Sequence, residues 1–452
     1  MDNKIKNTFD YIENELNKFA TDNWDIFYLN DQSRQISLRN SEVEDFTESL
    51  ENGFAIRLLH ENRISMVFGN NFEKDKVLKT IENAKFILKM MSPDNHFSMN
   101  KMIHPAKLTD SDKDWSFFDV GISDKVSKLK YLENKVFSEH KSISKVEHLG
   151  FSESYSNMYY RTKFSDIHEE ESLVYGFDAD VIAEDGNEAE SGSDFSYKLC
   201  FKDIDLDALG KSVAYNAYSM LHAKPLKSNA YKVVFRNDVV ASFLSFFIDL
   251  FSAENIQNKK SILDDKIGQK IAASTLNLID DGVLKDGLGT IAFDGEGTTS
   301  KATTLIKDGV LNHFLYNLKA ASKDNTESTG NGLRGSYYSI PVIRPTNLIL
   351  SPGQYSYQDL FSSSGEDILI INSVMGMHTS NRVNGDFSLG ATGYLMRNGE
   401  LVSSVKQFTI AGNFIDLLTR IAKIGNDVES FPYGGNILTP SLLFNSISVS
   451  GI

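Results

Sequence analysis

A glycine-rich run, Gly330-Asn331-Gly332-Leu333-Arg334-Gly335, is the strongest nucleotide-binding pattern in the chain. It matches the dinucleotide fingerprint, in which a tight glycine turn places pyrophosphate on a helix N-terminus. That fingerprint follows a strand and opens a helix. Here a polar stretch at 323–329 precedes the run, and the segment 336–341, which ends in Pro341, reads as extended. We therefore interpret the run as a loop and not as a cofactor site.

Histidine and cysteine chemistry is poorly supported. His168-Glu169 resembles the start of a zincin motif, in which histidines one helical turn apart bind zinc beside a catalytic glutamate. The second histidine is missing, because Ser172 and Leu173 occupy its place, and no two of the nine histidines lie three to five positions apart. Cys200 is the only cysteine, which excludes a disulfide framework and a cysteine-rich zinc site. It falls in a predicted strand without a nearby histidine, and we interpret it as structural.

Serine and carboxylate chemistry is no better supported. The run Gly-Asp-Phe-Ser-Leu-Gly at 385–390 lacks the Gly-x-Ser-x-Gly spacing of a nucleophile elbow. Asp280, Asp281, Asp294 and Glu296 could supply paired carboxylates for acid–base work. Aspartate beside glycine is also the commonest turn chemistry, and we favour turns. An enzyme whose metal site combines these four carboxylates with scattered histidines stays open as an alternative.

Composition narrows the class of protein. The 452 residues carry 61 Asp plus Glu against 46 Lys plus Arg, a formal charge of -15, and no basic block offsets it. Such a chain repels polyphosphate backbones, so we expect no nucleic-acid partner. The most apolar stretch, 239–251, falls short of the roughly 20 residues of a membrane helix and contains Asp249. We expect no membrane association and, with one cysteine, a cytoplasmic location.

The first 70 residues change period from helix to strand. An amphipathic helix is predicted at the start, because apolar residues recur at spacings of three and four: Ile5, Phe9, Ile12, Leu16 and Phe19. The hairpin-rich segment 23–70 then alternates short apolar runs with polar turns, one of them at 60–63. Antiparallel strands are the expected structure there.

The next 150 residues alternate helical and extended patterns. Helical spacing returns at 72–91, 124–140 and 205–222, and a second strand region spans 145–201. Within it, the acidic, glycine-containing stretch 184–192 is typical of an exposed loop. The pattern predicts an α+β fold.

We predict two domains, an N-terminal α+β domain at 1–225 and a β-rich domain at 226–452. Pro225 and polar neighbours mark the boundary. Asp308-Gly309 and Asn398-Gly399 supply the positive φ angles of tight hairpins, so the second half should be sheet-dominated.

Helices are expected in this second half near 239–251 and 411–424.

A resemblance to a known family rests on four segments that occur in a set order and spacing. They are 289–297 (GTIAFDGEG), 327–334 (ESTGNGLR), 385–394 (GDFSLGATGY) and 409–414 (TIAGNF). Together they resemble the TldD/PmbA family over nearly the whole C-terminal half, with a looser similarity at 52–57 and 72–91. The resemblance implies a two-domain TldD/PmbA-like fold and a metallopeptidase family, once named for modulation of DNA gyrase.

The catalytic branch of that family, TldD, carries His-Glu-x-x-x-His on the helix after the first strand of the C-terminal domain, and a cysteine near the C-terminus. The matching helix here, 239–251, contains neither His nor Glu, and no cysteine follows 425–427. Apolar side chains cannot replace imidazole or thiolate ligands of zinc. The chain therefore resembles the PmbA (TldE) branch, which implies no zinc or other cofactor here and zinc in a TldD-type partner.

That resemblance implies a cytoplasmic heterodimer with a TldD-like subunit, acting on peptides or unfolded proteins, in which this chain alone is catalytically silent. The residues that we expect to contact the partner or the peptide are Ser328, Thr329, Gly330, Asn331, Arg334, Asp386 and Ser388. The alternative is a non-enzymatic homodimer that binds peptides by strand addition and acts as a modulator.

Overall fold

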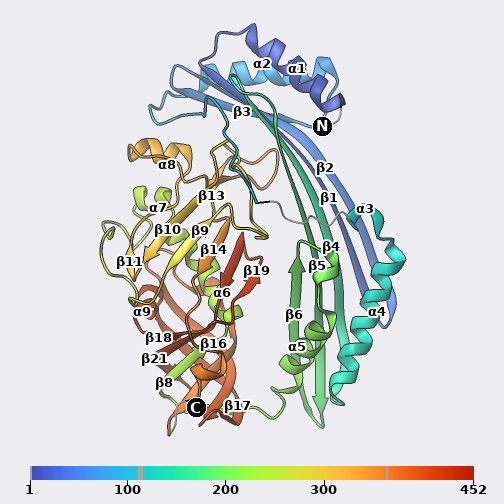
Figure 1. Cartoon of the computed structure of the whole chain (residues 1–452), viewed down its shortest axis with the longest axis vertical. Helices are drawn as coiled ribbons and strands as arrows, with labels where there is room; N and C mark the ends of the chain where they lie inside the picture. Colours follow the sequence, from blue (N-terminus) through green and yellow to red (C-terminus); the bar gives the residue numbers. More distant parts are fainter. Residues whose placement is uncertain (1–2, 110–115, 363–364) are drawn as a thin grey trace.

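The computed structural model describes residues 3–109, 116–362 and 365–452. Its N-terminal half is built on one long, curved antiparallel sheet of six strands in the order β3-β2-β1-β4-β5-β6 (Figure 1). The strands are β1 (Asn23–Arg39), β2 (Glu42–His60), β3 (Arg63–Gly69), β4 (Ile143–Thr162), β5 (His168–Asp185) and β6 (Glu188–Lys198).

Helices cover this sheet at two places, and each place has its own core. One end is covered by the first two helices, whose apolar stripes include Phe9 and Val77 and pack against Trp24. Along the rest of the sheet, two further helices bury Leu129 and Val213. The helices are α1 (Asn3–Asn17), α2 (Lys74–Met90), α3 (Ser116–Asp119), α4 (Ile122–Glu139) and α5 (Leu206–Tyr218).

Two sheets form the C-terminal half. A seven-stranded sheet has the order β18-β21-β8-β15-β16-β17-β7, and a six-stranded sheet has the order β11-β10-β9-β14-β20-β19. The strands are β7 (Lys224–Pro225), β8 (Asn229–Phe235), β9 (Leu278–Asp281), β10 (Ala302–Lys307), β11 (Val310–Leu311), β14 (Asn347–Leu350), β15 (Asp367–Met375), β16 (Asp386–Arg397), β17 (Glu400–Asn413), β18 (Ile421–Ile424), β19 (Glu429–Phe431), β20 (Asn436–Thr439) and β21 (Leu442–Ser450).

Smaller elements complete this half. A two-stranded ribbon pairs β12 with β13, and helix α6 follows β8 directly and runs into a short 3₁₀ turn. The elements are β12 (Gly332–Leu333), β13 (Val342–Ile343), α6 (Asn237–Phe247), the 3₁₀ turn Ile248–Phe251, α7 (Ala253–Gln257), α8 (Leu318–Lys323) and α9 (Phe414–Thr419).

The predicted α+β class, the opening helix and both glycine hairpins are confirmed; Asp308 and Gly309 have φ of 51° and 78°. Three expectations are wrong in detail. The stretch 184–192 is a hairpin between β5 and β6 and not a loop. The helix expected at 411–424 shrinks to α9, because β17 stays paired with β16 up to Asn413. Cys200 is buried just after β6 and not within a strand.

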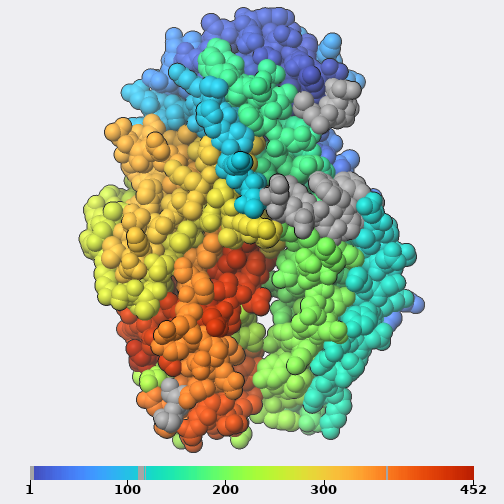
Figure 2. Space-filling model, viewed as in Figure 1, coloured from blue at the N-terminus to red at the C-terminus, as the bar shows by residue number. Residues whose placement is uncertain are grey.

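The two halves meet along one surface and separate along another. Where they meet, a shared apolar cluster combines Phe27 and Tyr160 from the N-terminal sheet with Phe293 and Tyr337 from the C-terminal half. Further along, Figure 2 shows a hollow between the green surface of β6 and α5 and the orange and red C-terminal strands. The contact surface and the hollow are two of the places where residues from both halves come together.

Candidate functional site

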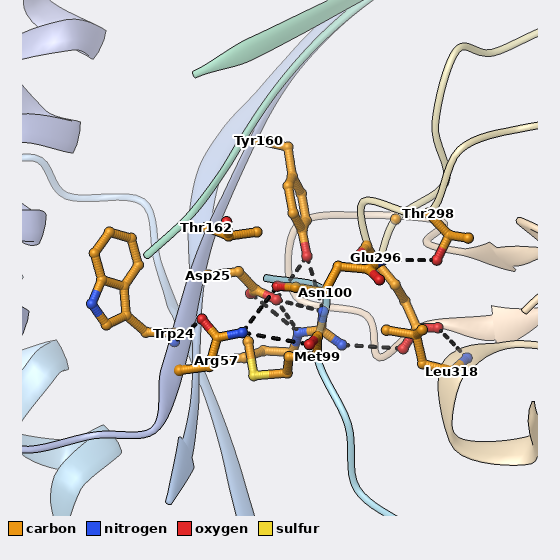
Figure 3. Close-up of polar contacts among 12 residues, drawn as sticks. Trp24, Asp25, Arg57, Met99, Asn100, Tyr160, Thr162, Glu296, Thr298 and Leu318 are labelled. Carbon is orange, nitrogen blue, oxygen red and sulfur yellow. Dashed lines mark hydrogen bonds and ion pairs between the residues drawn. The ribbon is translucent and has the colours of Figure 1, made fainter. Parts of the chain in front are cut away.

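A buried ion-pair cluster lies where the halves meet (Figure 3). Arg57 of β2 donates from Nε and Nη2 to the Asp25 carboxylate of β1, at 2.9 and 2.5 Å to Oδ2, and from Nη1 to Oε1 of Glu296 at 3.3 Å. Tyr160 of β4 donates its hydroxyl to Asp25 at 2.7 Å. Although burial lowers the pKa of Arg57, the charges of Asp25, Tyr160 and Glu296 hold it well above the ordinary value. The guanidinium thus ties three strands to the C-terminal half.

Glu296 accepts two further hydrogen bonds. Its Oε2 accepts the backbone N–H of Leu318 at 2.8 Å, and its carbonyl accepts from Nδ2 of Asn100 at 3.1 Å. Asn100 also donates to Oγ1 of Thr298 at 3.0 Å. The segment that carries Asn100 crosses from one half to the other, so it is fastened at the same point.

Arg334, one of the predicted contact residues, is buried beside this cluster. Its Nε donates to the carbonyl of Gly295 at 2.8 Å, and its guanidinium lies 4.6 Å from the ring centroid of Phe27. Its two terminal nitrogens are buried without a hydrogen-bond partner among the described residues. Burial and the nearby charge of Arg57 lower the pKa of Arg334 to about 10. The side chain packs inside this chain, and its contact with a partner stays a prediction.

Asp294 joins two of the four family-like segments. It accepts backbone hydrogen bonds from Glu296 at 2.9 Å, from Thr298 at 2.8 Å and from Gly332 at 2.8 Å. Burial and the charge of Glu296 raise the pKa of Asp294 to about 7. The turn expected at 294–297 therefore exists, with φ of 73° at Gly297, whereas Asp280 and Asp281, for which a turn was also expected, lie in β9. The carboxylates of Asp294 and Glu296 also belong to the buried network.

The polar run before Arg334 is buried too. Asn331 donates from Nδ2 to Asp280 at 2.6 Å, and Ser328 and Thr329 donate to the carbonyl of Tyr316 at 3.0 and 3.1 Å. Gly330 has φ of 80°, which favours glycine. These bonds give the run a structural role, and its contact with a partner or peptide remains a prediction.

The two remaining predicted contacts, Asp386 and Ser388, lie on β16 and are exposed. Asp386 accepts from Nδ2 of Asn384 and of Asn413, each at 2.8 Å. These bonds order the turn before β16 and leave Ser388 free to meet a partner, which stays a prediction.

The hollow beside β6 contains three neighbouring cavities of about 820, 460 and 500 Å³. Arg236 and Asp238, at the start of α6, lie where these cavities meet. Arg236 donates from Nε to Asp238 at 3.2 Å and from Nη1 to the side-chain oxygens of Asn216 and Asn372 at 3.2 and 2.6 Å. Burial raises the pKa of Asp238. The cleft thus has a polar centre, and the 500 Å³ cavity has aromatic walls that include Tyr357.

The sequence resemblance matches helix α6 to the zinc-binding helix of the catalytic branch, and this match stays a prediction. The side chains at 245–247 are not zinc ligands and are used in packing. Ser245 donates its hydroxyl to the carbonyl of Tyr433 at 3.1 Å, Phe246 lies under Arg382 at 4.3 Å, and Phe247 stacks on Phe414 at 4.7 Å. Within 3–109, 116–362 and 365–452, no three His, Cys, Asp or Glu side chains come together as metal ligands. The four carboxylates considered above therefore form no such group.

Sequence reasoning missed Asp25, Arg57, Arg236 and Asp238. A weak signal existed for the first two, since each is a charged residue inside an otherwise apolar strand pattern, and buried charges are rare unless paired. Arg236 and Asp238 flank a predicted strand–helix junction, where charged residues are common. Their pairing partners come from distant segments, which no local pattern indicates.

No described helix is long and apolar enough to span a membrane. Comparison with known proteins identifies the chain more closely. Three family models match it in sequence: "PmbA/TldA metallopeptidase domain 1" at 24–88, the central domain at 115–221 and the C-terminal domain at 228–451.

Named relatives come from both branches. Metalloprotease PmbA of Escherichia coli O157:H7 is 24% identical over 420 residues, covering 92% of this chain and 89% of that protein. A metalloprotease TldD homologue of Buchnera aphidicola subsp. Acyrthosiphon pisum is 28% identical over 267 residues, 56% of this chain and 55% of that protein. The crystal structure of TldE from Thermococcus kodakarensis has the same fold, with a TM-score of 0.89, 21% identity and coverage of 99% and 100%. The chain therefore belongs to the TldD/PmbA family of metallopeptidases.

Proposed function

We propose that this chain is the zinc-free subunit of a cytoplasmic TldD/PmbA-type metallopeptidase complex that acts on peptides or unfolded proteins. The observation that carries the proposal is the composition of α6. Ser245, Phe246 and Phe247 make packing and backbone contacts there, and the helix contains no histidine or cysteine to supply an imidazole or a thiolate to zinc. A TldD-type partner supplies the zinc.

The cleft supports a role in holding substrate. The cavities around Arg236 and Asp238 have the size of pockets that take small ligands, which commonly measure about 300–1,000 Å³, and this leaves room for part of a peptide. Arg236 is fixed by Asp238, Asn216 and Asn372, and a fixed polar group orients a ligand at little entropic cost. Matches to both PmbA and TldD relatives support a pairing of the two chain types.

The test combines metal analysis with a peptidase assay. We expect the chain purified alone to contain no stoichiometric zinc and to leave an unstructured peptide intact, and expect cleavage when a TldD-type chain from the same source is added. The matched control is that partner with its zinc-binding histidines replaced, which should abolish cleavage. Stoichiometric zinc with activity in the chain alone would overturn the proposal. Peptide binding without cleavage, with or without the partner, would favour the non-enzymatic homodimer.

A further inference from the structure

Strand β2 has a long unpaired edge. Its residues 54–60 pair with β3, but between 42 and 51 none of the described residues pairs with the side that faces away from β1. Every residue from Glu42 to Glu51 is exposed. At about 3.3 Å per residue, this free edge extends roughly 30 Å. An unpaired edge of this length offers a row of backbone N–H and C=O groups to another strand.

One face of this edge is apolar. Val43, Phe46 and Leu50 are 49%, 42% and 63% exposed. In the register with β1, Val43 lies opposite Leu38 and Phe46 opposite Ile36, and both β1 residues are buried in the core under α4. The apolar strip therefore lies on the face of the sheet that α4 covers, but beyond the area that the helix covers. A strand added to β2 would bury it.

The same edge is strongly acidic. Between 42 and 51 the chain has no lysine or arginine and five carboxylates: Glu42, Glu44, Asp45, Glu48 and Glu51. Among the described residues, two of them have a cationic partner, since Arg39 lies 2.9 Å from Glu44 and Arg34 lies 2.8 Å from Glu48. If two copies of the chain paired along this edge, carboxylates would face carboxylates, and like charges on paired strands are destabilising. The edge is thus unsuited to self-pairing.

We infer that the free edge of β2 at 42–51 is a docking surface for an extended segment of a partner chain in which basic and apolar residues alternate. Backbone hydrogen bonds extend the sheet, the apolar residues of the segment cover Val43, Phe46 and Leu50, and its basic residues face the carboxylates. In the peptidase complex this segment belongs to the TldD-type partner, an identification that rests on the proposed function. The preference of the edge for a basic strand does not depend on it.

The probe that tests the inference is a ten-residue peptide of alternating lysine and valine, with alternating glutamate and valine as its counterpart. Binding to the full chain is measured by titration calorimetry. We expect the lysine peptide to bind, with an affinity that falls as salt screens the charges, and the glutamate peptide not to bind.

Two variants of equal charge change locate the binding. Asp45→Lys with Glu51→Lys on the β2 edge should weaken binding of the lysine peptide by about tenfold or more. These carboxylates lie on the face opposite Phe46 and Leu50, where the lysines of the peptide lie, so attraction becomes repulsion. Glu73→Lys with Glu82→Lys, at exposed positions at and within α2, should leave it nearly unchanged. Phe46→Ser with Leu50→Ser should also weaken binding, since the apolar contact is lost.

Equal binding of both peptides, or equal weakening by the β2 and α2 variants, would overturn the inference, because the attraction would then be unspecific. The measurement uses the chain alone and no protease activity. Zinc found in the chain would therefore contradict the proposed function and leave the binding result intact.

Discussion

At the scale of single residues, the buried carboxyl group of Asp280 makes the stability of the chain depend on pH. Burial raises its pKa from 3.8 to about 6, although Asn331 and Thr346 donate hydrogen bonds to it. Between about pH 4 and pH 6 the folded chain therefore keeps a proton that the unfolded chain has lost. By linkage, the free energy of unfolding contributed by this group falls as pH rises through that window and is level above it.

We predict that Asp280→Asn removes this part of the pH dependence, because an amide does not titrate in the window. The variant should also be less stable by about 1–3 kcal/mol, since its NH₂ group would face the NH₂ group of Asn331. Urea unfolding at several pH values between 4 and 7 gives the difference curve between wild type and variant. The control, Asp286→Asn, makes the same change at an exposed position. An unchanged slope in Asp280→Asn, or the same change in both variants, would contradict the prediction.

The sequence predicted part of the local chemistry of these buried residues. Asp294 was expected in a turn, and the turn is present, because aspartate beside glycine favours one wherever it occurs. Its membership in an ion-pair network was not predicted. Arg57, which contacts Glu296 in that network, lies 239 positions earlier in the chain. Only the three-dimensional fold brings such partners together.

At the scale of elements, two hairpin glycines share a positive φ but differ in the space around them. Replacing each of them therefore separates the cost of backbone strain from the cost of steric crowding. Gly186 and Gly309 both have positive φ, 62° and 78°. A Cβ atom at Gly186 would meet nothing within 4 Å, whereas one at Gly309 would lie 2.5 Å from the carbonyl oxygen of Ala272 and 2.6 Å from that of Ala273. The carbonyl of Gly309 also accepts the N–H groups of Ile271 and Ala272, so a shift of the turn breaks hydrogen bonds.

We therefore predict that Gly186→Ala lowers the free energy of unfolding by about 1–2 kcal/mol, the cost of a left-handed alanine. Gly309→Ala should lower it by a further 1–3 kcal/mol or so, because the backbone around it must move. Urea denaturation of both variants gives the comparison. Equal losses would show that the contact at Gly309 relaxes without cost.

The boundaries of helices and strands were predictable where local turn residues end them. The turn at Asn398-Gly399 is one such place, since its two positive φ angles suit asparagine and glycine. The segment 411–424 was predicted as one helix and is divided among β17, α9 and β18. There the ladder with β16 decides how far the strand continues, and Asn413 caps the short helix by accepting from the N–H of Ile415. Tertiary pairing overrides the local pattern in such a segment.

At the scale of the whole molecule, the two halves have separate large cores and attach to each other at more than one place. The buried ion-pair cluster around Arg57 is one of these places and is called the joint here. The family-like segments 289–297 and 327–334 carry Asp294, Glu296 and Arg334 to that joint, next to Arg57. The resemblance singled out these segments as candidates for partner or peptide contact, which stays a prediction, and in the structure they lie where the halves attach to each other.

The joint should make the halves unfold together, and Arg57→Ala should uncouple them. The variant removes the guanidinium that bonds Asp25 and Glu296 and leaves them with the more distant Arg334, 4.0 Å from Asp25, which costs about 3–5 kcal/mol. Lys125→Ala is the matched control, because Lys125 pairs with Glu153 at 2.6 Å, equally buried but entirely within the N-terminal half. By calorimetry we expect one transition in wild type, one at lower temperature in Lys125→Ala, and two in Arg57→Ala. A single transition in Arg57→Ala would mean that the other contacts between the halves couple them without Arg57. These are the apolar clusters around Phe293 and Tyr394 and the ion pairs of Lys406 with Glu188 and Glu190.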